Sequence, residues 1–188
     1  MSLFRVPRKV TLPAPAVERA RWFAANVIST VDYSDSRQSD AAKISDDHFV
    51  SKLGEEAVRQ LMITLGFTVE GPDYTIYESK QKSWDADLRI NGQGVAVKTQ
   101  RRSTAQKFGL SWTFQCGKMR RDAVLDDPDA WVFFVEYDDS GSGSCDLWVY
   151  PPYKVGKLRF RPPKKRELIG EKQVVYAEDL PAHRRRQA

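Results

Sequence analysis

The spacing of apolar residues predicts two amphipathic helices near the N-terminus. Apolar side chains recur every three or four positions over residues 14–30 and, more regularly, over residues 46–66; this is the spacing of one helix face. Asp46 or Asp47 can cap the second helix, and Gly66 can end it. The polar stretch between the helices, rich in Ser and Asp, predicts a long loop or a segment that orders on binding.

Beyond the second helix the pattern changes to short apolar runs and alternation, which predicts strands. The expected strands cover residues 67–70, 74–78, 87–90, 95–99, 110–116, 131–137, 145–150 and 173–176, with a short helix over 118–125. Residues 91–94, Asn-Gly-Gln-Gly, are a strong hairpin signal, and residues 131–137 are apolar enough for a central strand. Helices packed on a central mixed sheet make the expected fold class α/β (α+β).

The length of the chain predicts a single domain. Its 188 residues suffice for one buried core, and no repeat divides them. Within this domain we expect a basic arm over residues 1–15, a core over 46–137 and a basic tail over 183–188. The N-terminus lacks the apolar segment of a signal peptide, and no apolar run approaches the roughly 20 residues of a membrane span. These features predict a cytoplasmic protein.

Charge and composition narrow the chemistry that the chain can perform. The net charge of +5 is a modest basic excess, which favours partners rich in phosphate. The two cysteines, Cys116 and Cys145, lie far apart, which argues against a disulfide framework or a cysteine zinc site. The two histidines, His48 and His183, are too few for a histidine-rich metal site. Any metal would therefore be held by oxygen, which indicates magnesium, manganese or calcium.

The turn of the predicted hairpin decides which charged side chains face one another. Side chains alternate along a strand. A two-residue turn at Asn91-Gly92 sets Asp87 opposite Ala96 and Asp85 opposite Lys98, whereas a four-residue loop sets Asp87 opposite Lys98. Both registers place the same polar side chains on one face, and a bulge would break this parity. That face carries Asp85, Asp87, Lys98 and Gln100.

A carboxylate beside a lysine on a strand pair suits phosphodiester hydrolysis. The carboxylate can hold a divalent ion, which polarises the phosphate and lowers the pKa of bound water. Lys98 can orient or deprotonate that water, and Glu55 or Glu56 from the preceding helix can complete the metal site. The alternative is a solvated hairpin whose Asp and Lys form a surface pair that contributes little.

Three segments follow one another in the chain: Lys52-Leu-Gly-Glu55-Glu-Ala-Val, Asp85-Ala-Asp87-Leu-Arg-Ile-Asn-Gly and Val95-Ala-Val-Lys98-Thr-Gln. Together they resemble the core of the PD-(D/E)XK nuclease superfamily, in which a helix bearing Glu precedes a strand that opens with Asp and a strand that carries (D/E)XK. The resemblance covers roughly residues 46–137.

The resemblance implies a restriction-endonuclease-like core and a Mg²⁺-dependent endonuclease, with Mn²⁺ able to substitute. It implies that Glu55 and Asp87 are metal ligands, with Asp85 as a further candidate, that Lys98 is the motif lysine, and that Gln100 assists. The implied substrate is double-stranded DNA, cut at specific sites by an enzyme of the restriction or homing type. A chain this short that must cut both strands is expected to work as a homodimer.

The sequence departs from the family pattern at the acidic position of (D/E)XK, which is occupied by Ala96. Three explanations stay open. The site has migrated, with Asp85, Glu55 or Gln100 supplying the missing oxygen; the protein is a catalytically inactive DNA-binding relative; or the alanine replaces an acid that was removed by design. A junction resolvase, a repair nuclease and a basic protein-interaction domain are further alternatives.

A literal PD pair, Pro72-Asp73, lies in a turn after Gly71. Placing Asp73 beside Lys98 would require the chain to skip a strand, so Asp87 is the preferred strand aspartate.

Basic residues that follow the predicted catalytic strand suit backbone phosphates, which position DNA without reading its sequence. Such contacts are expected from Arg101, Arg102, Lys107, Lys118, Arg120, Arg121, Arg159, Arg161, Lys164 and Lys165. Residues 36–39 in the long loop could read base edges. The alternative for each of these segments is an ordinary solvated surface.

Overall fold

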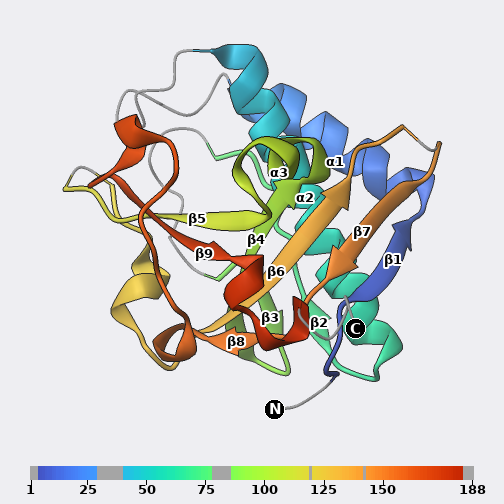
Figure 1. Ribbon diagram of the computed structural model, residues 1–188. Helices are drawn as coiled ribbons and strands as arrows, with labels where there is room; N and C mark the ends of the chain where they lie inside the picture. The colour runs from blue at the N-terminus through green and yellow to red at the C-terminus, as the bar shows by residue number, and fades with distance from the viewer. Residues whose placement is uncertain (1–3, 29–39, 78–85, 119, 142, 184–188) are drawn as a thin grey trace.

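The computed structural model describes residues 4–28, 40–77, 86–118, 120–141 and 143–183. A mixed seven-stranded sheet forms the centre of the fold (Figure 1), with strand order β1-β7-β6-β4-β3-β2 and with β8 paired to β6. Its strands are β1 Arg8–Leu12, β2 Val69–Glu70, β3 Leu88–Ile90, β4 Gln93–Arg101, β6 Trp131–Asp138, β7 Cys145–Val149 and β8 Tyr153–Lys154. Strands β4 and β6 run parallel, and the other pairs are antiparallel.

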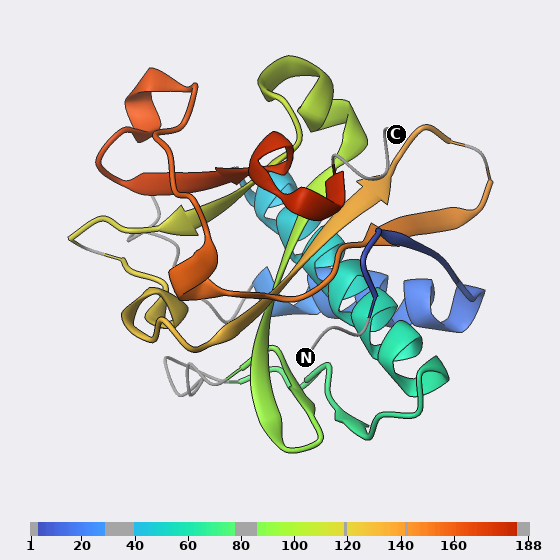
Figure 2. The same cartoon turned by 60° about the horizontal axis from the view of Figure 1, so that its bottom comes forward.

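Two long helices lie on one side of this sheet and a two-stranded ribbon on the other (Figures 1 and 2). Helix α2 (Ala41–Thr64) crosses the sheet, and α1 (Ala14–Val27) packs against α2. The ribbon pairs β5 (Ser111–Gln115) with β9 (Lys172–Tyr176). A short helix, α3 (Arg102–Phe108), follows β4 directly. This arrangement confirms the expected α+β class. Among the described helices, none has both the length and the apolar character needed to cross a membrane.

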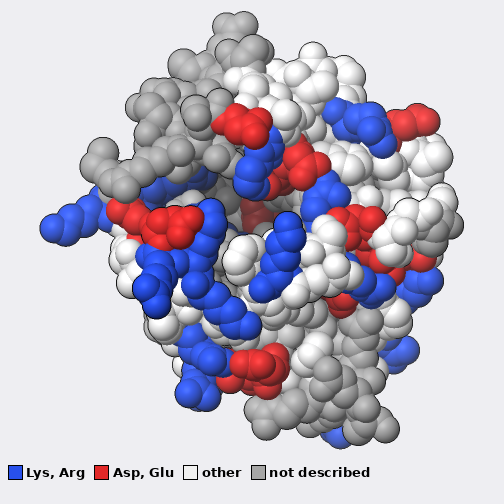
Figure 3. All heavy atoms as spheres, turned by 45° about the horizontal axis from the view of Figure 1, so that its top comes forward, with Lys and Arg blue, Asp and Glu red and all other residues white. Residues whose placement is uncertain are grey.

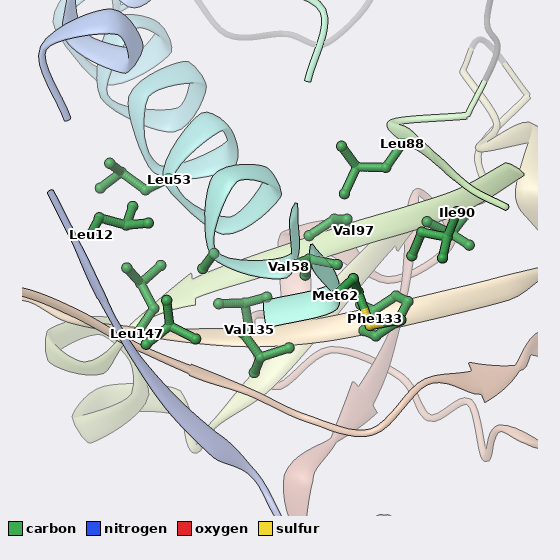
Figure 4. Close-up of a cluster of buried hydrophobic side chains, with 14 of the residues drawn as sticks. Leu12, Leu53, Val58, Met62, Leu88, Ile90, Val97, Phe133, Val135 and Leu147 are labelled. Carbon is green, nitrogen blue, oxygen red and sulfur yellow. The ribbon is translucent and has the colours of Figure 1, made fainter. Parts of the chain in front are cut away.

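The sheet has a hydrophobic core on each face. On the helix side, Leu53, Val58 and Met62 of α2 pack against Val97 and Phe133 of the sheet (Figure 4). The second core holds buried residues of β6 and of the ribbon, among them Val132, Phe134, Trp112, Phe114 and Val175. Strand β6 is therefore covered on both faces, which explains its unbroken apolar run.

The start of α2 differs from the sequence-based prediction. The helix begins at Ala41, where the Asp40 carboxylate accepts a hydrogen bond from the Lys43 backbone nitrogen at 3.1 Å. Asp46 and Asp47, expected as caps, lie inside the helix. The first turn buries only Ile44, so its apolar periodicity is too weak to reveal the true start.

The basic N-terminal arm also contains structure that its composition concealed. Residues Arg8–Leu12 form the edge strand β1, which pairs with β7 and buries Val10 and Leu12.

Two other predictions of secondary structure were wrong. Residues 74–77 form no strand, and the described part of 118–125 holds only a 3₁₀ turn that begins at Ala123.

Gly54 allows α2 to approach β4 closely. A Cβ atom added at Gly54 would lie 1.8 Å from the Thr99 hydroxyl oxygen, which has no hydrogen-bond partner among the described residues. We expect Gly54→Ala to lower the free energy of unfolding by about 1–3 kcal/mol, because overpacking forces the helix and strand apart. Urea unfolding of Gly54→Ala, Thr99→Ala and the double variant measures this effect. The double variant should recover most of the loss; equal losses with and without Thr99→Ala would contradict this packing.

The β1–β7 edge contains a carboxylate whose charge stabilises the fold. Asp146 accepts hydrogen bonds from Thr11 Oγ1 at 2.6 Å and Ser144 Oγ at 2.9 Å, and its Oδ2 lies 2.9 Å from Lys9 Nζ. The bonds from Thr11 and Lys9 lower its pKa from 3.8 to about 2.

Because the folded-state pKa of Asp146 is depressed, its stabilisation is present above pH 4 and is lost as the pH falls toward 2. We expect Asp146→Asn to unfold at lower temperature than the wild type at pH 7, with the difference narrowing between pH 4 and pH 2. Thermal unfolding followed across this range measures it. A difference that stays constant with pH would show that the charge of Asp146 does not contribute.

Candidate functional site

The hairpin turn settles the register of the candidate site. Ile90 pairs with Gln93, and the two residues between them, Asn91-Gly92, both have positive φ angles, 48° and 78°. This two-residue turn confirms the first of the two registers predicted from the sequence. Continued by one step beyond β3, it brings Asp87 beside Ala96 rather than beside Lys98.

Alternation along β4 directs Lys98 away from the long helices. Val95 and Val97 belong to the helix-side core, whereas Ala96 packs against the second core. The Lys98 ammonium lies 5.0 Å from the centroid of the Phe114 ring on the ribbon. The candidate site therefore faces the layer that β5 and β9 form over the sheet.

The carboxylate that contacts Lys98 is Asp122, a residue that sequence reasoning missed. Lys98 Nζ lies 2.6 Å from Asp122 Oδ2, and the two side chains are 24% and 18% exposed. The Asp122 carboxylate also accepts a hydrogen bond from the Gln115 backbone nitrogen at 3.2 Å, and the Asp122 nitrogen donates to the Gln115 carbonyl. No local motif marks Asp122, because it reaches Lys98 only through the fold of the segment after β5.

Asp87 is half-buried beside β4, directly before β3 begins. Its Oδ2 accepts a hydrogen bond from the Val97 backbone nitrogen at 2.7 Å, which holds the carboxylate one residue away from Lys98 along the strand. The bond continues the pairing of β4 beyond the end of β3. Asp85, the other predicted strand carboxylate, lies outside the described residues.

Gln100 shares the face of Lys98, as predicted, but it has a structural partner. Its Oε1 accepts a hydrogen bond from the Ser111 backbone nitrogen at 2.6 Å. This contact joins the end of β4 to the start of β5. Gln100 therefore positions the ribbon over the sheet, and its amide oxygen is already engaged.

Glu55, the predicted helix ligand, belongs to a separate group that we call the Lys52 cluster, in which Lys52, Glu55 and Glu56 are buried. Its members are Lys52, Glu55, Glu56, Arg19 and Tyr74. Lys52 Nζ lies 2.6 Å from Glu55 Oε2, and Glu56 Oε1 accepts hydrogen bonds from Arg19 at 2.9 Å and from the Tyr74 hydroxyl at 3.0 Å. Burial and the Glu56 charge raise the pKa of Tyr74, so the hydroxyl stays protonated and donates.

The literal Pro72-Asp73 pair has a structural role in a local turn. Asp73 accepts hydrogen bonds from the Thr75 backbone nitrogen and from the Tyr77 hydroxyl, both at 2.8 Å. These contacts are local to the segment after β2. They give Asp73 a structural explanation and leave Asp87 as the aspartate beside β4.

Most of the predicted phosphate-binding residues have acidic partners. Arg101 bonds to Asp46, and Arg102 bonds to Glu136 at 2.8 Å and to Asp138, which fixes the start of α3. The other paired residues are Arg121 with Asp126, Arg159 with Asp179, Arg161 with Glu178 and Asp179, and Lys165 with Glu167. Lys107, Lys118 and Lys164 are exposed, and Arg120 is half-buried.

The side of the molecule that carries α3 and the start of α2 is hollowed. Figure 3 shows basic and acidic side chains gathered around this hollow, beside atoms of residues that are not described. Residues 36–39 and 184–186, expected as DNA contacts or a basic tail, lie outside the described part of the chain.

His48 packs against Phe23 with ring centroids 6.1 Å apart, which is a structural contact.

The donor atoms near Lys98 suit a hard cation, although their number in the described chain is small. Carboxylate oxygens are the ligands that Mg²⁺ prefers; Asp122 supplies them at Lys98, and Asp87 supplies them one residue along β4. Across the described ranges, no three Asp, Glu, His or Cys side chains gather as a metal site.

Comparison with known proteins adds no relative to this picture. No family model, curated protein or solved structure matches the chain.

The Lys52 cluster yields a test of whether Glu55 is structural. We expect Glu55→Gln to lower the free energy of unfolding by about 3–5 kcal/mol, because it leaves the Lys52 charge buried without its partner. Replacing both residues, as Lys52→Met with Glu55→Leu, should recover most of this loss. Urea unfolding measures both variants. If Glu55→Gln unfolds like the wild type and yet abolishes an activity, the residue is catalytic and not structural.

Proposed function

We propose that this chain is a Mg²⁺-dependent endonuclease that hydrolyses phosphodiester bonds of double-stranded DNA. The order of elements supports the proposal: a helix bearing Glu55, then a strand that Asp87 precedes directly, then a strand bearing Lys98. This is the order that the resemblance to the PD-(D/E)XK superfamily implies.

The observation that carries the proposal is the contact between Lys98 and Asp122. A lysine and a carboxylate meet at 2.6 Å, both partly exposed, and the Asp87 carboxylate is bonded to the residue before Lys98. The pair is only partly buried, so both side chains keep some access to solvent and to a ligand. A carboxylate beside Lys98, with the Asp87 carboxylate one residue along the strand, supplies groups of the kind that metal-assisted phosphodiester hydrolysis uses.

Each of these residues has a distinct role in the proposed reaction. Asp87 and Asp122 would hold the metal ion, together with Asp85 from outside the described residues. When bound, such an ion polarises the phosphate and lowers the pKa of water. The Lys98 ammonium offsets negative charge on the phosphate and orients the attacking water. In this reading Asp122 replaces the carboxylate that Ala96 lacks, which is a form of site migration.

A second candidate function is DNA binding without chemistry. It is favoured by Ala96 and by the small number of carboxylates that gather near Lys98 in the described chain. In that case Asp122 only neutralises Lys98.

For the endonuclease, we expect a homodimer, since cleavage of a duplex requires attack on both strands.

A matched pair of aspartate variants tests the endonuclease proposal. Plasmid and phage DNA are incubated with the protein in Mg²⁺ or in EDTA, and cleavage is followed on gels. We expect Asp122→Asn and Lys98→Met each to reduce Mg²⁺-dependent cleavage by at least about 100-fold, a loss of about 2.7 kcal/mol of transition-state stabilisation. Asp126→Asn, the same substitution four residues away, should cleave like the wild type.

The outcomes separate the two candidate functions. Cleavage that survives Asp122→Asn in a folded protein would remove Asp122 from the site. Cleavage by Ala96→Glu alone would indicate a nuclease that lacks its motif acid. DNA binding without cleavage by any variant would support the binding module.

A further inference from the structure

The outer edge of β1 carries main-chain groups that point away from the sheet. Strand β1 is the last strand of the sheet on the side of β7 (Figure 1), and it pairs only with β7. The Tyr150 nitrogen donates to the Phe134 carbonyl of β6, and the direction of the main-chain groups alternates along an antiparallel strand. Val149 therefore directs its main-chain groups toward β1, where it faces Arg8.

The same alternation directs the N–H and C=O groups of Lys9 and Thr11 outward, away from β7. Within the described ranges, the hydrogen-bond partner found for these four groups is Gln60 Nε2, which lies 3.5 Å from the Thr11 carbonyl oxygen. A hydrogen bond of this length is weak. The edge can therefore accept a further strand.

The side chains at this edge do not protect it from pairing. Lysines and prolines commonly discourage the addition of a strand to an exposed edge. Lys9 Nζ, however, lies 2.9 Å from Asp146 Oδ2, and Thr11 Oγ1 donates to Asp146 Oδ1 at 2.6 Å. Both side chains are thus held against β7, on a face of the sheet and not across its edge.

Two prolines restrict how a second strand can pair here. Pro7 and Pro13 stand at equal distances on either side of Val10, two residues beyond Lys9 and Thr11. Proline lacks the N–H group that a strand ladder needs. The edge is therefore symmetric about Val10 in its hydrogen-bonding groups, as the pairing of two identical strands requires.

The antiparallel alignments of a second β1 strand differ in what they place opposite the outward groups. With Lys9 opposite the partner's Lys9, like charges meet and Thr11 faces the partner's Pro7. With Thr11 opposite the partner's Thr11, Lys9 faces the partner's Pro13. With Lys9 opposite the partner's Thr11, every outward N–H and C=O group has a partner.

We propose that β1 is a dimer interface, at which a second copy of this chain adds its own β1 antiparallel, with Lys9 opposite the partner's Thr11. The twofold axis then passes at Val10, which faces the partner's Val10. Leu12 faces the partner's Arg8, so no like charges are directly opposite one another. Because Val10 and Leu12 belong to the helix-side core, that core continues across the axis. The choice of a second copy as the occupant rests in part on the proposed function, which requires attack on both strands of a duplex.

An exchange of two residues tests this interface and its register. Sedimentation velocity over a dilution series, in EDTA and without DNA, measures the dissociation constant of the dimer. We expect Thr11→Lys to raise this constant about tenfold, because it places a lysine opposite the partner's Lys9 at both symmetry-related positions. Combining Lys9→Thr with Thr11→Lys keeps the composition, places lysine opposite threonine again, and should restore the wild-type value.

The matched control is Thr113→Lys, which changes an exposed threonine of strand β5, on the ribbon and away from β1. It should dimerise like the wild type. A wild type that stays monomeric throughout the series would overturn the proposal. A folded Thr11→Lys protein that dimerises unchanged, or an exchanged variant that stays as weak as Thr11→Lys, would reject the register. Dimerisation without cleavage supports the interface, whereas cleavage by a monomer would retain the nuclease and reject the interface.

A second measurement needs no variant and covers the case in which Thr11→Lys does not fold. Amide hydrogen exchange of the wild type is followed by NMR at several protein concentrations. We expect the Lys9 and Thr11 amides to exchange faster on dilution, whereas the Val10 amide, which faces β7, exchanges at a constant rate. Lys9 and Thr11 amides that exchange at one rate at every concentration would overturn the proposal.

Discussion

The side chains of β4 alternate between two covered faces, and this constraint determines the chemistry that the strand can carry. Val95 and Val97 pack under α2, while Ala96, Lys98 and Gln100 point toward the ribbon. A polar group that is taken from water must find a partner inside the protein. Lys98 accordingly meets Asp122, and Gln100 meets the Ser111 backbone. The ribbon that covers the candidate site is thus also the element that supplies its partners.

The same constraint explains why so many of the basic residues are paired. Arg101 ends β4 and Arg102 begins α3, and their carboxylate partners come from α2 and β6 and from the residues after β6. These arginines connect the end of the strand to three neighbouring segments. A phosphate at this place would have to compete with those carboxylates.

The sequence predicted those features whose cause is local. The stripe of α2, the apolar run of β6 and the Asn91-Gly92 turn each depend on neighbouring residues, and all three are present. The start of α2 and the strand β1 were missed, because the first has little apolar periodicity and the second is disguised by basic residues and prolines. Asp122 was missed for a different reason: its meeting with Lys98 joins residues 24 apart through the fold of the ribbon. Glu55 was assigned to a metal site because it matches the helix glutamate of the family pattern, but that match could not reveal that Lys52 is its partner.

An alanine at position 96 fits the packing of β4 under the β5–β9 ribbon. Its side chain packs against the second core, under the layer that carries Phe114 and Trp112. A longer acidic side chain at this position would place a charge against apolar groups, at a cost unless a cation or hydrogen bonds compensated it. A carboxylate on the segment after β5 reaches Lys98 from above the strand and avoids that cost. Its position depends on the docking of the ribbon, since Gln115 holds it. In the proposed enzyme, the reactive pair would therefore form only when the ribbon is in place, whereas an acid on the strand itself would be present without it.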